Sequence, residues 1–164
     1  MKTKITLITI FFITISFSQS KNTLELFAIM QGQDFRIVGD TLRVKSEVTN
    51  LVLSDHPHSK LIVEIIKGQT LGEKIEEFYY LLLRDKKHNV TIARWLEKID
   101  NNLYFVTKFV GSNYWQVLTT ACIGPDDCNP QVAIIDSTKQ WVCGTALVCK
   151  IESNCKKISA IGTD

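Results

Sequence analysis

Cysteine is the residue type with the clearest chemistry in this 164-residue chain. All five cysteines lie in its last third, at Cys122, Cys128, Cys143, Cys149 and Cys155. Structural zinc sites prefer cysteine pairs separated by two to four residues, and redox and c-type haem motifs need C-x-x-C. The spacing here is C-x5-C followed by C-x5-C-x5-C, which matches neither. In an oxidising compartment such cysteines form disulfide bonds.

The sequence leaves the cysteine pairing open. Cys122 and Cys128 bracket a Gly-Pro-Asp-Asp loop that a bridge would close, with Cys149–Cys155 or Cys143–Cys149 as the second bridge. Long-range pairing of Cys143 or Cys149 to Cys122 or Cys128 fits equally well. Because five is an odd number, we expect two bridges within the chain and one thiol. A buried free thiol is the simpler interpretation of that thiol, and a disulfide-linked dimer is the alternative.

The candidate metal ligands are His56 and His58, in the run Asp55-His56-Pro57-His58. Imidazole and carboxylate are common metal ligands, and Pro57 would keep the run extended so that both rings lie on one side. A solvated turn between two strands explains the same residues with fewer assumptions. We therefore predict neither a metal nor any other cofactor.

Aromatic residues gather in the second half of the chain, at Trp95, Trp115, Trp141, Tyr104 and Tyr114. Together they are a candidate surface for stacking a sugar or a peptide partner, because aromatic rings combine a large contact area with a polar group. Ordinary core and cross-strand packing is the simpler interpretation. The sequence has no G-x-S-x-G, H-E-x-x-H or S-x-x-K motif and no phosphate-binding glycine loop.

The first twenty residues predict a secretory signal of bacterial type. Lys2 and Lys4 precede an apolar run over residues 5–17, and small Ser16 and Ser18 flank its end. A membrane span needs about 20 apolar residues, so this run is too short for an anchor and fits a cleaved signal at 1–20. The rest of the sequence contains no comparable apolar stretch, and we expect a secreted or periplasmic chain without a membrane span.

Removing the signal makes the chain neutral. Taking Lys2 and Lys4 from the 19 bases leaves 17, which equals the 17 acids. A nucleic-acid partner requires a basic surface, and an anionic membrane requires a polybasic patch. The charge balance therefore argues against both, and an unknown protein or small ligand is the expected partner.

The pattern of apolar residues predicts one helix, over about residues 71–87. Leu71, Ile75, Phe78, Tyr79 and Leu82 fall on one helical stripe. The Thr70–Glu73 spacing resembles a capping box. Acids crowd the start of this segment and bases its end, as a helix dipole favours.

Alternating and apolar runs predict strands at 24–30, 35–38, 41–52, 61–66, 90–99, 103–110, 114–121, 132–135, 140–143 and 145–151. We expect one α+β domain over 21–164, an antiparallel meander or roll packed on the helix, with a disulfide-bearing C-terminal segment at 122–155. In general arrangement this is similar to cystatin-like rolls, in which a curved sheet wraps one helix. A small lipocalin-like barrel is the alternative fold.

These features favour a secreted or periplasmic binding module without catalytic activity, such as an inhibitor or a domain that binds a ligand or partner. A structural or assembly component of the cell envelope is one alternative. An enzyme whose site residues are dispersed along the sequence is another, and the lack of catalytic motifs argues against it.

Overall fold

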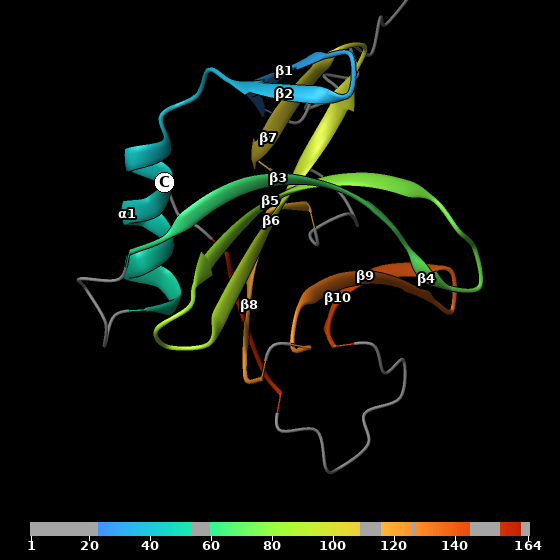
Figure 1. The fold of residues 1–164 in the computed structure, drawn as a ribbon. Coiled ribbons are helices and arrows are strands. Elements are labelled where there is room, and N and C mark those ends of the chain that lie inside the picture. The colour runs from blue at the N-terminus through green and yellow to red at the C-terminus, as the bar shows by residue number, and fades with distance from the viewer. Residues whose placement is uncertain (1–22, 54–59, 109–115, 126, 145–154, 162–164) are drawn as a thin grey trace, which may run out of the picture.

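The computed structural model describes residues 23–53, 60–108, 116–125, 127–144 and 155–161 (Figure 1). The expected signal at 1–20, the candidate ligands His56 and His58, and the expected strand at 145–151 lie outside these residues.

The described residues form two sheets. The larger has eight strands, all paired antiparallel, in the order β11-β8-β6-β7-β1-β2, with β5 beside β6 and β3 beside β5. Its strands are β1 (Thr23–Gln31), β2 (Asp34–Ile37), β3 (Ile62–Gln69), β5 (Glu77–Asp85), β6 (Val90–Ile99), β7 (Asn102–Lys108), β8 (Leu118–Ile123) and β11 (Lys156–Ile161). The smaller sheet has the order β10-β9-β4, from β4 (Leu71–Gly72), β9 (Pro130–Ile135) and β10 (Thr138–Cys143).

Strand β6 organises the larger sheet. Its first part pairs with β5 and β8, and its last three residues pair with β7 instead. The sheet therefore curls into a half-barrel, and the smaller sheet lies across one of its faces (Figure 1). The protein is mostly antiparallel β rather than α+β, so the expected antiparallel sheet with one helix is confirmed only in outline.

The helix lies where the sequence predicts a strand. Helix α1 spans Thr41–Val52, and Asp40 caps it by accepting hydrogen bonds from the backbone N–H groups of Leu42 and Arg43 at 2.9 and 3.0 Å. Val44 and Val48 are buried, whereas Leu42 is 76% exposed. Residues four apart, such as Val44 and Val48, lie on one face of a strand and also on one face of a helix. The interpretation of this segment as an alternating strand was therefore wrong.

The predicted helix at 71–87 is also wrong, because this segment holds β4 and β5. The run from Phe78 to Leu83 is apolar on both sides of the strand, as a central strand requires. The Thr70 hydroxyl donates to the Lys74 carbonyl at 2.7 Å and accepts from the Glu76 N–H at 2.8 Å. Thr70 therefore closes a loop instead of starting a helix.

Most other predicted strands are confirmed where the structure describes them. The β6–β7 turn has Asp100 at φ +53°, and the β9–β10 turn has Asp136 and Ser137 at +49° and +58°. Two successive residues with positive φ are typical of the type I′ turns that join hairpin strands. The final described strand, β11, lies further along the chain than the expected one.

The larger sheet carries an apolar core on each face. The first core includes Phe27, Val48 and Phe105 and lies against α1. The second joins the larger sheet to the smaller one and consists of Phe78, Ala93, Trp95, Val132 and Trp141. Successive strand residues point to opposite faces, so neighbouring residues of β5 and β6 contribute to different cores.

A chain of ion pairs fixes α1 to the larger sheet. Arg43 of the helix bonds Glu25 of β1 and lies 2.7 Å from Glu47. Glu47 in turn lies 3.1 Å from Arg94 of β6, whose guanidinium carbon is 4.5 Å from the centre of the Phe105 ring. These ion pairs extend from the half-exposed Arg43–Glu25 pair to the largely buried guanidinium of Arg94. They therefore orient the helix over the first core.

Two disulfides connect distant parts of the C-terminal third, Cys122–Cys143 and Cys128–Cys155. The local bridges Cys122–Cys128, Cys143–Cys149 and Cys149–Cys155 are therefore wrong, and the long-range pairing of Cys143 to Cys122 is the one observed. Cys149 lies outside the described residues. The bridges close loops with sequence separations of 21 and 27, for which chain entropy gives about 3 kcal/mol each.

The cap of α1 yields a test of the revised fold. Replacing a capping Asp by Ala costs about 1 kcal/mol, so Asp40→Ala should lower the free energy of unfolding by that amount in a urea titration. Asp34→Ala, at an exposed residue of β2, is the matched control and should have a smaller effect. Equal stability of Asp40→Ala and the parent protein would contradict a helix at this position.

Candidate functional site

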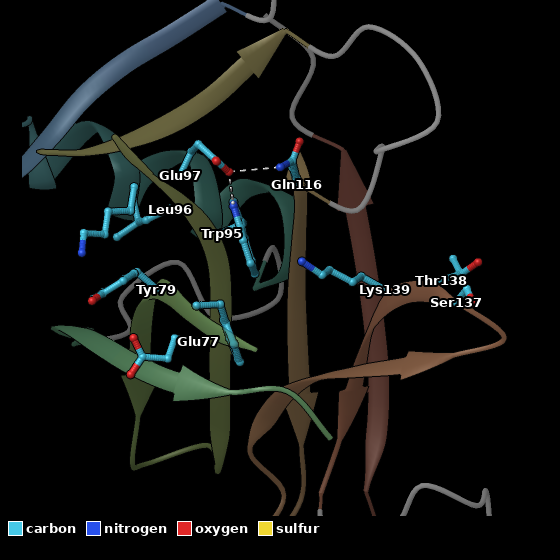
Figure 2. A pocket seen from close by; sticks show the side chains of 11 residues that line it. Glu77, Tyr79, Trp95, Leu96, Glu97, Gln116, Ser137, Thr138 and Lys139 are labelled. Atoms are coloured by element: carbon cyan, nitrogen blue, oxygen red, sulfur yellow. Dashed lines mark hydrogen bonds between the residues drawn. The ribbon is translucent and has the colours of Figure 1, made fainter. Parts of the chain in front are cut away.

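A cleft of about 590 Å³ opens between the larger and the smaller sheet (Figure 2). Its walls are the start of β5, the end of β6, Gln116 and the β9–β10 hairpin. Aromatic side chains of β5 and β6 form its base. Its polar lining consists of Glu77, Glu97, Lys98, Gln116, Ser137, Thr138 and Lys139.

The rings of Phe78 and Trp95 at this base belong to a larger stack of rings from three strands. Phe78 lies parallel to Trp95, with ring centres 5.4 Å apart, and stacks on Tyr80 at the same separation. Trp141 of β10 meets Phe78 and Tyr80 edge to face, at 6.3 and 5.8 Å. Because Trp141 belongs to the smaller sheet, this contact holds the β9–β10 hairpin beside β6 and sets the width of the cleft.

A carboxylate is held in place above this base. Trp95 and Glu97 are two residues apart on β6, so their side chains lie on the same face. The Trp95 indole N–H and the Gln116 side-chain amide both donate to Oε2 of Glu97, at 3.0 and 3.1 Å (Figure 2). Among the described residues, Trp95 and Gln116 are the partners of this carboxylate, and both bond the same oxygen.

Lys139 extends from the hairpin across the cleft toward Trp95 (Figure 2). Its ammonium is 5.8 Å from the centre of the Trp95 ring and 2.6 Å from Glu76. Hydrogen bonds from Lys139 and then Lys74 lower the pKa of Glu76 from its ordinary 4.5 to about 2. Glu76 thus stays charged and keeps Lys139 in position throughout the physiological pH range.

The other end of the cleft has a second lysine over a second ring. Lys98 lies 5.5 Å from the centre of the Tyr79 ring, and Glu77 pairs with Lys67 at 2.6 Å. The cleft is thus lined by two carboxylates and two ammonium groups, whose formal charges cancel.

The tip of the hairpin is fixed by the loop before β5. The Glu73 carboxylate accepts hydrogen bonds from the backbone N–H groups of Asp136 and Ser137, at 3.1 and 3.3 Å. A Cβ atom on Gly72, which has φ +96°, would lie 2.4 Å from the Ile134 carbonyl oxygen. Glycine therefore lets β4 run directly beside β9, and Ser137 and Thr138 are held at the mouth of the cleft.

The structure separates the aromatic residues of the candidate partner surface. Trp95 and Trp141 both belong to the second core, with 6% and 1% of their surface exposed, and of the two Trp95 lines the cleft. Tyr104 is half-buried on β7, outside the lining of the cleft. Tyr114 and Trp115 lie outside the described residues.

Sequence reasoning missed the polar residues of the cleft, including Glu97, Gln116 and Lys139. The pair Trp95-x-Glu97 on an alternating strand is a signal that places a carboxylate beside a tryptophan. Nothing in the sequence brings Gln116 and Lys139 to the same place, because their positions follow from strand pairing and from the packing of the hairpin.

A second cavity, of about 430 Å³, lies between the β5–β6 turn and the loop after β8. Its wall includes Asp85, a buried residue whose carboxylate lies 2.6 Å from Nδ1 of His88 and accepts from the Lys87 N–H at 2.9 Å. Asp85 therefore shapes the turn. Among the described residues, no three His, Cys, Asp or Glu side chains gather as a metal site would require.

No protein-family model, curated protein or solved structure matches this chain. Among the described residues, no helix is long and apolar enough to cross a membrane.

The Lys139–Glu76 pair yields a prediction on titration. The pKa of Glu76 is lower in the folded protein than in the unfolded chain, so the ionised Glu76 stabilises the fold above pH 4.5. This contribution is lost as the pH falls toward 2. Lys139→Met should raise the pKa of Glu76 toward its ordinary value, as followed by carbon NMR of the carboxyl group. Lys156→Met, on exposed β11, is the matched control. An unchanged Glu76 titration in Lys139→Met would show that the pair does not form.

Proposed function

We propose that this protein is a secreted or periplasmic binding module without catalytic activity, and that the cleft between its two sheets takes a small polar ligand. The observation that carries the proposal is the fixed Glu97 carboxylate above an aromatic base. Ligand sites are concave and carry a few oriented polar groups, and this cleft has both properties.

The chemistry of the lining favours binding over catalysis. Neither histidine nor cysteine is among the described residues that line the cleft, so the described lining offers no imidazole to activate the hydroxyls of Ser137 and Thr138. The carboxylates of Glu77 and Glu97 diverge (Figure 2), whereas paired catalytic carboxylates must flank one bond.

Two features support export from the cytoplasm. The first twenty residues have the pattern of a secretory signal, and the two disulfides suit an oxidising compartment. Both fit a protein that meets its ligand outside the cytoplasm.

The test is a titration of the oxidised chain lacking residues 1–20, labelled with ¹⁵N, against small saccharides, amino acids and dipeptides. The Trp95 indole N–H signal, assigned with Trp95→Phe, reports on the cleft. We expect at least one class of probe to shift this signal saturably. Glu97→Gln should weaken that binding, and Glu64→Gln, an exposed control on β3, should not. No saturable shift with any class would refute the proposal.

A further inference from the structure

The aromatic rings of the cleft are already covered by ammonium groups. Lys139 lies over Trp95 and Lys98 lies over Tyr79, at 5.8 and 5.5 Å from the ring centres. A cationic or planar aromatic ligand would compete with these lysines for the ring faces. The lining therefore disfavours both kinds of ligand and leaves polar groups as the main contacts.

The charges of the cleft are balanced and partly paired. Its two carboxylates and two lysines cancel formally, and Lys139 and Glu77 already have partners of opposite charge. A charged ligand that binds Lys139 or Glu77 would compete with these pairs. A neutral ligand with many hydrogen-bonding groups would leave them intact.

Donors and acceptors both line the cleft. The Glu97 carboxylate accepts, the ammonium group of Lys139 donates from beside the same Trp95 ring, and the hydroxyls of Ser137 and Thr138 do both. A sugar hydroxyl both donates and accepts, so neighbouring hydroxyls of one ring can satisfy a carboxylate oxygen and an ammonium group together.

We propose that the cleft binds a neutral saccharide, with Glu97 as the acceptor for its hydroxyls and Lys139 as a donor. This inference rests on the proposed function, because it names the ligand class of the same site. The fixed carboxylate is its main support: two N–H groups orient Glu97 before any ligand arrives, which lowers the entropy lost on binding.

The experiment compares two matched sets of probes on the oxidised protein lacking residues 1–20. One set is neutral oligosaccharides, including glucans, chito-oligosaccharides and galacto-oligosaccharides, and the other is zwitterionic, acidic and basic dipeptides. We expect an oligosaccharide to shift the Trp95 indole signal saturably. Its Kd should hardly change between low and high salt, because screening weakens only charged contacts.

Glu97→Gln tests the assigned role without removing the side chain. Its amide oxygen can still accept from Trp95 and Gln116, but its NH₂ group puts a donor in place of the other carboxylate oxygen. Loss of a hydrogen bond to a charged group should weaken saccharide binding about tenfold. Lys139→Met should weaken it as well, and Glu64→Gln should leave it unchanged.

The outcomes separate the two proposals. Salt-sensitive binding of a dipeptide alone would overturn the saccharide inference and leave the binding module standing. No binding by either set would overturn both. Saccharide binding that Glu97→Gln leaves unchanged would show that the ligand does not use this carboxylate, and the inference would fail there.

Discussion

The contact between Trp141 and the rings of Phe78 and Tyr80 is the interaction on which the architecture of the site depends. It lies where the smaller sheet packs on the larger one, and it sets the distance of the β9–β10 hairpin from β5. Aromatic pairs contribute about 1 kcal/mol each beyond the burial of their area. The backbone makes room for this stack at Gly68, opposite Phe78, where a Cβ atom would lie 2.9 Å from the ring.

Covalent and ionic contacts reinforce the same junction. The Cys122–Cys143 bridge joins β8 of the larger sheet to β10 of the smaller one. Glu73 holds the hairpin tip, and Glu76 holds Lys139. Each of these contacts connects the hairpin to a segment that is distant in sequence. The cleft is therefore a consequence of how the two sheets are joined, and its polar groups are positioned before any ligand binds.

The sequence predicted the strands with clear alternation or clear turn residues, and it misplaced the helix. Val44 and Val48 are spaced for either a strand or a helix, and the exposed Leu42 favoured the wrong choice. The apolar run around Leu81 was assigned to a helix because periodicity does not distinguish a strand buried on both faces from a buried helix. In both cases tertiary contacts decided the outcome.

Local sequence patterns could not predict the disulfide pairing or the cleft, and the reason is similar. Cys122 meets Cys143 because β8 and β10 approach each other, although 21 residues separate the two in sequence. Glu97 and Gln116 are ordinary polar residues until the pairing of β6 with β8 brings them together. The sequence showed the types of residue that could bind a ligand, and the order of the strands determined which of them share a site.

The most direct test of this account is a nuclear Overhauser measurement between aromatic rings in the oxidised chain lacking residues 1–20. The account predicts cross-peaks from the Trp141 ring protons to those of both Phe78 and Tyr80. A Trp141 ring that shows neither contact and exchanges its indole proton rapidly with water would contradict it, because the two sheets would then not be joined as described.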